Sequence, residues 1–324
     1  MLASSFLWSA CDNEIDLIAP YKEIGVIYGI IFASTDTIHK IRIQKAFLGE
    51  GNANQMAQVH DSTYYPDILD VQLQRIKDGS VISTIPLTRY TGPDKAEGVF
   101  PVTPNILYRT NGETIFRDSD YKIVVKNTVS GHEFSATTPI VDSMKITRPS
   151  RSPGSVITFS NPLYPYNVEF VTGVNGKVIH MTIRFHYGEE VIGTGIVESK
   201  YIDWEFPDVI VDDPSSTQSL RIEVEGEEFY QFVGQQLQAD PNILRYAGTL
   251  DFIFNSGAEF LANYVSINEA TTSILTTAPY YSNVVGGTGI FSSRYTQTVP
   301  NKSMDAPSKD LLLTSPHTSD LGFQ

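Results

Sequence analysis

Apolar and polar residues alternate with a period of two along much of the chain, as in β-strands with one buried face. Residues 69–76 alternate in this way, and residues 81–85 do so again after Asp78-Gly79. Asp-Gly between two such runs predicts a tight hairpin, because both turn residues need positive φ. Ser130-Gly131 stands in the same way between residues 121–126 and 132–138. These patterns predict a mostly β protein, and for residues 20–140 an immunoglobulin-like β-sandwich of about seven strands.

The second half alternates as well and then changes its period. Residues 178–187 alternate after Asn175-Gly176, which predicts another hairpin turn, and residues 190–206 and 219–225 predict further strands. Between residues 227 and 239 the apolar side chains fall at helical spacing, which predicts one short helix. The sequence therefore predicts a second β-rich domain that carries one short helix.

The length of 324 residues suggests about two domains. Prolines and small polar residues indicate a linker between them, and the Ser- and Thr-rich end has few apolar residues to bury. The expected organisation is an N-terminal segment at 1–11 that ends in the single cysteine, an acidic linker at 12–19, the first domain at 20–140, a linker at 141–154, the second domain at 155–300 and a disordered tail at 301–324.

The net charge of -14 argues against nucleic acid as a partner, because phosphate binding needs clustered Lys and Arg. It also argues against loose adsorption to anionic lipid. No apolar run approaches the roughly 20 residues that span a bilayer. The single cysteine, Cys11, allows no internal disulfide and no multi-cysteine metal site.

Cys11 follows an apolar stretch and two small residues, Ser9 and Ala10. This arrangement looks like the end of a bacterial lipoprotein signal peptide, whose cysteine becomes lipidated and anchors the protein in the membrane. Trp8 and the lack of a basic opening depart from that pattern, so we expect the natural start to lie upstream. The alternative is an ordinary buried cysteine.

Acidic and polar residues follow Cys11 directly, namely Asp12, Asn13, Glu14 and Asp16. They resemble the surface-export signal of Bacteroidota lipoproteins. A solvated acidic linker explains them equally well.

Three segments together resemble a family of Bacteroidota outer-membrane lipoproteins defined only as a domain of unknown function. They are Cys11 to Leu17, Arg117 to Val125, and Tyr281 to Arg294 with its Gly-Gly-Thr-Gly cluster. The resemblance implies a cell-envelope lipoprotein of the outer membrane, often encoded beside TonB-dependent transporters. It implies no catalytic residues.

No segment matches a catalytic or cofactor motif. The cluster at residues 286–289 lacks the Lys and helix of a phosphate loop, so tight turns or close backbone packing explain its glycines better. His180 and His186 lie six residues apart on one predicted strand, roughly 20 Å, too far to share a metal ion. Acidic pairs such as Glu189-Glu190 are expected in solvated turns. We therefore predict no catalytic residues, no metal site and no cofactor.

Paired tyrosines are the remaining candidates for a binding face. They are Tyr64, Tyr65, Tyr164, Tyr166, Tyr280 and Tyr281. Tyrosine rings present a large apolar surface with a polar tip, although packing in the core explains such residues at least as well. Trp204 alternates with Ile202 and Phe206 and is expected in the core.

These observations favour a binding or accessory lipoprotein of the outer membrane, facing the exterior in one reading and working beside a transporter. A structural or adhesion protein that uses its sheet edges is the alternative. A glycan or peptide hydrolase is the third hypothesis, and no sequence motif favours it.

Overall fold

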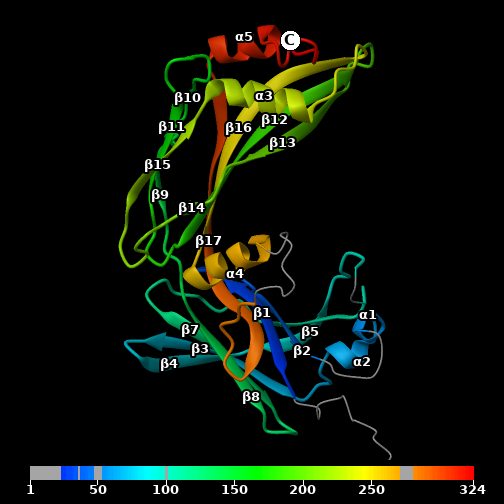
Figure 1. Ribbon diagram of the computed structural model, residues 1–324, viewed down its shortest axis with the longest axis vertical. Helices are drawn as coiled ribbons and strands as arrows, with labels where there is room; N and C mark the ends of the chain where they lie inside the picture. Colours follow the sequence, from blue (N-terminus) through cyan, green and yellow to red (C-terminus); the bar gives the residue numbers. More distant parts are fainter. Residues whose placement is uncertain (1–22, 36, 47–52, 99–100, 271–279) are drawn as a thin grey trace, which may run out of the picture.

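The computed structural model describes residues 23–35, 37–46, 53–98, 101–270 and 280–324. With 48% strand and 13% helix it confirms the prediction of a mostly β protein. Two bodies lie end to end along the long axis (Figure 1). We call them the lower and the upper body, as they stand in the figure. Cys11 and the acidic residues Asp12, Asn13, Glu14 and Asp16 lie outside the described residues.

The lower body consists of two sheets. One runs in the order β17-β1-β2-β6-β5 and the other in the order β4-β3-β7-β8. Buried side chains from both sheets, among them Ile27, Ile41, Leu73, Ile123 and Phe291, form one hydrophobic cluster. The elements are β1 (Gly25–Ile31), β2 (Lys40–Lys45), α1 (Ala53–Ala57), α2 (His60–Thr63), β3 (Leu69–Lys77), β4 (Ser80–Pro86), β5 (Thr88–Gly92), β6 (Asn105–Arg109), β7 (Asp120–Asn127), β8 (Glu133–Pro139) and the start of β17 (Gly287–Met304).

Both predicted hairpins of this body are confirmed. Asp78 and Gly79 have φ values of 50° and 75° and join β3 to β4. The turn containing Gly131, whose φ is 76°, joins β7 to β8.

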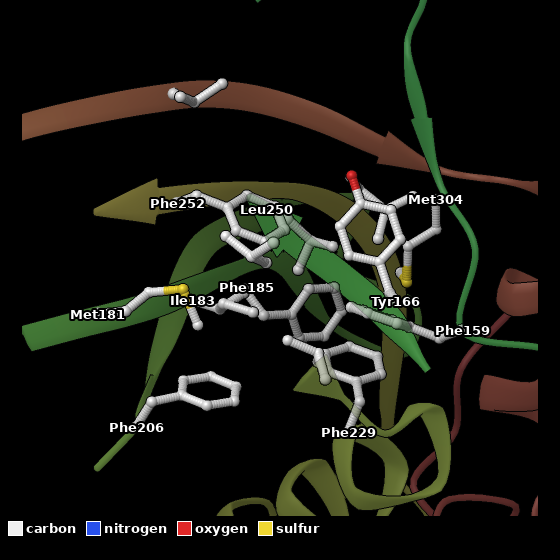
Figure 2. Close-up of a cluster of buried hydrophobic side chains, with 14 of the residues drawn as sticks. Phe159, Tyr166, Met181, Ile183, Phe185, Phe206, Phe229, Leu250, Phe252 and Met304 are labelled. Carbon is white, nitrogen blue, oxygen red and sulfur yellow. The ribbon is translucent and has the colours of Figure 1, made fainter. Parts of the chain in front are cut away.

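The upper body continues the first sheet through β16-β12-β13 and adds a second sheet, β15-β11-β9. Aromatic rings fill the space between these sheets and α3, and Figure 2 shows Phe185 beside Phe229 in the middle of this core. Their ring centroids lie 5.4 Å apart with the rings nearly perpendicular, an edge-to-face contact that aromatic pairs favour. The elements are β9 (Lys145–Arg148), β10 (Val156–Ile157), β11 (Tyr166–Val171), β12 (Val178–Val191), β13 (Val197–Glu205), β14 (Val209–Ile210), β15 (Ser219–Val224), α3 (Gly226–Gln236), β16 (Ile243–Gly257), α4 (Glu259–Ala270) and α5 (Ala306–Thr314).

Strand β17 belongs to both bodies. Its residues 287–293 pair in parallel with β1, and residues 294–302 pair antiparallel with β16. The glycines at its start permit close backbone packing: a Cβ on Gly289 would lie 2.1 Å from the carbonyl oxygen of Ile27, and Gly289 has a φ of 106°. This confirms the interpretation of the glycine cluster as a packing feature. The second predicted domain, 155–300, is therefore not a single structural unit, because its residues 287–293 pair with β1 in the lower body.

The prediction of a hairpin turn at Asn175-Gly176 is wrong. Asn175 does adopt a positive φ of 67°, but β11 and β12 on either side of it belong to different sheets. The Asn175 side chain instead donates a hydrogen bond to the carbonyl oxygen of Ile140 at 3.0 Å. A turn signal fixes the local backbone, whereas the pairing of the flanking strands depends on the rest of the sheet.

The prediction of a disordered tail at 301–324 is also wrong. Residues 301–304 complete β17, α5 follows, and Leu312, Leu321 and Phe323 are buried in the upper core. Asp305 caps α5 by accepting a hydrogen bond from the backbone N–H of Ser308 at 2.9 Å. A few well-placed apolar residues order a segment whose composition alone indicates disorder.

Further differences concern the helices and the predicted linker. The predicted helix at 227–239 corresponds to α3, but α4 lies where no helix was predicted, against β16 and β17 between the two bodies (Figure 1). The segment expected as a linker, 141–154, contains β9, which pairs with β11.

Among the described residues, no helix is long and apolar enough to cross a membrane.

An ion-pair network ties the chain end to β12 and β16. The buried guanidinium of Arg245 donates to Glu189 at 2.9 Å and to the carbonyl oxygen of Leu321 at 2.6 Å, and Lys200 also pairs with Glu189. Glu189 is 9% exposed and lies within β12, so the expectation that it occupies a solvated turn is wrong. Burial acts to raise the pKa of Glu189, but the hydrogen bonds from Lys200 and Arg245 outweigh it and hold that pKa below 4.5.

We predict that Gly289→Ala destabilises the protein by about 2 kcal/mol or more, because an L-residue is strained at that φ and its Cβ would clash with the Ile27 carbonyl. Chemical denaturation monitored by circular dichroism measures the loss. Gly98→Ala is the control, since a Cβ on Gly98 meets no atom of the described residues within 4 Å. Equal stability of the two variants would contradict the prediction.

We predict that Glu189→Gln lowers the free energy of unfolding at pH 7 by about 3–5 kcal/mol, because it leaves Arg245 buried without its counterion. The lowered pKa of Glu189 means that its contribution is complete above pH 4.5 and is lost as the pH falls through the pKa of the folded state. Urea unfolding across pH 7 to 3 should therefore show a steeper loss of stability in the wild type than in the variant.

The matched control for this experiment is Glu223→Gln, which breaks the exposed Arg221–Glu223 pair, with side chains 66% and 50% exposed. An exposed pair contributes about 1 kcal/mol or less. If Glu189→Gln behaved like this control, the network would not stabilise the fold.

Candidate basic cavity

The outward face of the β17-β1-β2 sheet in the lower body carries the candidate site. Successive strand residues point to opposite sides of a sheet. Ile27 and Ile31 on β1 point into the core and are fully buried, so Tyr28 and Ile30 between them point outward and are 42% and 36% exposed. On β2, Ile41 and Ile43 likewise point inward, which places Lys40, Arg42 and Gln44 on the outward face.

Two adjacent cavities lie on this face. The larger has a volume of about 480 Å³ and the smaller about 390 Å³, and Tyr28 borders both. Cationic side chains line them: Arg42, Lys45 and Lys95 the larger, and Lys40 and Arg294 the smaller. No Asp or Glu of the described residues lines either one. We call the larger one the basic cavity.

Arg42 is the most firmly held of these cations. It lies directly opposite Tyr28 in the register of β1 and β2. Its Nη2 donates to Asn105 Oδ1 at 3.2 Å, and Asn105 in turn donates to the carbonyl oxygen of Pro93 at 2.8 Å. The Nε of Arg42 is buried without a hydrogen-bond partner in the described part of the chain. One side of the guanidinium is therefore fixed while donor capacity remains unused.

Two further tyrosines lie near Tyr28 in the same region. Tyr264 comes from α4 and lines the smaller cavity, and Tyr280 lines the basic cavity. Burial raises the pKa of Tyr28, and the neighbouring hydroxyls of Tyr264 and Tyr280 and a hydrogen bond with Tyr264 raise it further. The Tyr28 phenol therefore stays neutral at physiological pH, and the three rings offer apolar faces with polar tips.

The tyrosines predicted for a binding face fall into two groups. Tyr64, Tyr65 and Tyr166 are 2%, 5% and 6% exposed and pack in the interior, so they offer no binding face. Tyr164 and Tyr280 are 70% and 69% exposed, whereas Tyr281 is partly buried. Of the six, only Tyr280 lines the basic cavity. Trp204 is partly buried against the upper core and stacks on Phe232, in agreement with its predicted core position.

The two histidines on β12 each have a carboxylate partner. His180 lies 2.8 Å from Asp208, and His186 lies 2.9 Å from Asp251. His180 and Asp208 line a third cavity of about 650 Å³ beside α4. The residue facing His180 on β16 is Asn255, while the hydroxyl of neighbouring Ser256 points to the opposite side of the sheet. In the described ranges no three His, Cys, Asp or Glu side chains cluster closely enough to hold a metal ion.

No known protein family matches the chain, and no curated protein matches it. The basic cavity was not predicted from the sequence, because its lining residues come from positions between 26 and 288 that only the fold brings together. The one local signal was the alternation Lys40, Arg42, Gln44 opposite Ile41 and Ile43, which marks a polar outward face.

Proposed function

We propose that this chain is a lipid-anchored envelope protein that binds a ligand without converting it. The observation that carries the binding role is the basic cavity, which tyrosines and cations border on the outward face of the sheet. Cavities of this size on a rigid scaffold are typical of small-molecule sites.

The anchoring part of the proposal rests on the sequence. Cys11 after Ser9 and Ala10, followed by acidic residues, supports lipidation and placement in the outer membrane, facing the exterior. The likeness to Bacteroidota lipoproteins supports a role beside a TonB-dependent transporter. The two sheets of the lower body share one core, which supports classifying this body as an immunoglobulin-like β-sandwich.

We predict that Cys11→Ser moves the protein from the membrane fraction to the soluble fraction of cells, because the variant has no thiol to lipidate. Detergent-phase partitioning followed by mass spectrometry of the N-terminus measures both the location and the acyl chains. Ser5→Ala, which keeps the cysteine, is the control and should stay membrane-bound. Retention of Cys11→Ser in the detergent phase would contradict the anchor.

One observation favours the alternative of a structural or adhesion protein. Strand β13 forms an open edge of the long sheet, and the hairpin before it exposes Ile192 and Ile196 by 54% and 68%. Open edges pair readily with other chains, although Glu198 and Lys200 on β13 counteract this.

Cross-linking in intact cells separates the two functions. The proposed function predicts cross-links to a transporter subunit that persist in Ile196→Asp. The adhesion alternative predicts cross-links to a second copy or a matrix component. It also predicts that Ile196→Asp abolishes them, because a charge on the hairpin before β13 opposes apolar contact.

A further inference from the structure

We infer that the basic cavity is a site for a small organic anion, a molecule that joins a carboxylate, sulfate or phosphate group to a ring or other flat apolar body. The inference rests on the proposed binding function and names its ligand class. It follows from the charge, the unused hydrogen-bond donors and the aromatic surface of the cavity.

The charge around the cavity is opposite to that of the whole protein. The chain carries 37 acidic and 23 basic side chains. In the body of the protein, cations such as Arg75, Arg184 and Arg245 are paired with carboxylates. Lys40, Arg42 and Arg294 all belong to the outward face of the β17-β1-β2 sheet, and none of the three forms an ion pair with a described carboxylate. A concave surface lined by one sign of charge concentrates ligands of the opposite sign.

The cavity also holds polar groups whose hydrogen bonds are unmade. Arg42 Nε and Thr288 Oγ1 are both buried, and neither has a partner among the described side chains and backbone. Buried polar groups of folded proteins nearly always have partners, and a lost partner costs about 1–3 kcal/mol. An acid group seated beside Arg42 supplies acceptor oxygens for the guanidinium, and arginine binds such groups with short, charge-assisted hydrogen bonds.

The sheet register places an aromatic platform beside this donor. Tyr28 lies opposite Arg42, and Val26 lies opposite Gln44 and beside Thr288. A ligand whose acid group reaches Arg42 therefore has its body over Tyr28, with Tyr280 at the rim. The cavity volume of about 480 Å³ accommodates a body of one or two rings.

Spacing limits how many cations one acid group can contact. Lys40 and Arg42 are two residues apart on β2, roughly 7 Å at the usual strand rise. Arg42 is level with Ile290 of β17, so Arg294 lies two strand spacings across the sheet and four residues along it, roughly 16 Å away. One carboxylate is too small to bridge these distances, so Arg42 binds the acid group directly while Lys40 and Arg294 raise the local potential.

The test uses the full chain and three probes: naphthalene-2-sulfonate, the neutral 2-naphthalenemethanol, and inorganic sulfate. We predict saturable binding of the sulfonate by isothermal titration calorimetry, and at least tenfold weaker binding of both other probes. Arg42→Gln should weaken sulfonate binding about tenfold or more, which corresponds to about 1.4 kcal/mol. Tyr28→Leu should also weaken it, and raising the salt from 50 to 500 mM should weaken the wild type.

Arg221→Gln is the matched control, because it removes the same charge from an exposed pair in the upper body, and it should bind like the wild type. Lys40 is exposed, so Lys40→Gln does not threaten the fold. A moderate loss of sulfonate affinity in this variant would show independently that the positive charge around the cavity attracts the anion. Circular dichroism verifies folding.

Equal binding of the neutral alcohol, equal binding of bare sulfate, or unchanged affinity in Arg42→Gln and Lys40→Gln would each overturn the inference. None of these results affects the membrane anchoring by Cys11, which the fractionation experiment tests separately. Loss of the anchor with intact sulfonate binding would overturn the proposed location and leave this site in place.

Discussion

The fold depends on one shared strand. Because β17 pairs in parallel with β1 and then antiparallel with β16, it makes one continuous sheet of the two bodies. The pairing with β1 requires the backbones to approach more closely at Gly287 and Gly289 than a side chain allows. Phe291 on this strand packs in the lower core and Val299 in the upper one. Whatever fixes β17 therefore fixes the relative position of both bodies.

The strands and the hairpins of the lower body could be predicted from the sequence because their determinants are local. Alternation sets which face is buried, and Asp78-Gly79 sets the turn. Asn175-Gly176 has the same local signal but joins strands of different sheets, so local reasoning fails there. The order of residues 301–324 could not be predicted for a related reason. Leu321 and Phe323 are buried in the upper core, and Arg245 hydrogen-bonds to Leu321, but these partners are distant in the sequence.

The basic cavity lies still further from sequence reasoning. The sequence shows that Arg42 alternates with inward isoleucines, but not that Tyr28 stands opposite it or that Arg294 shares its face. Paired tyrosines proved a poor guide, since a tyrosine fills a core as readily as it lines a surface. The charge of the whole chain also misleads, because a strongly acidic composition hides a small region of the opposite sign.

The parallel pairing of β1 with β17 joins segments about 260 residues apart. A ribosome must therefore synthesise about 260 further residues before β1 can pair with β17. Until then β1 has an open edge that can pair only on its β2 side. Contacts of such long range slow folding and leave the nascent chain unfinished for most of its synthesis. The sheet of the lower body therefore stays incomplete at β1 until β17 has been synthesised.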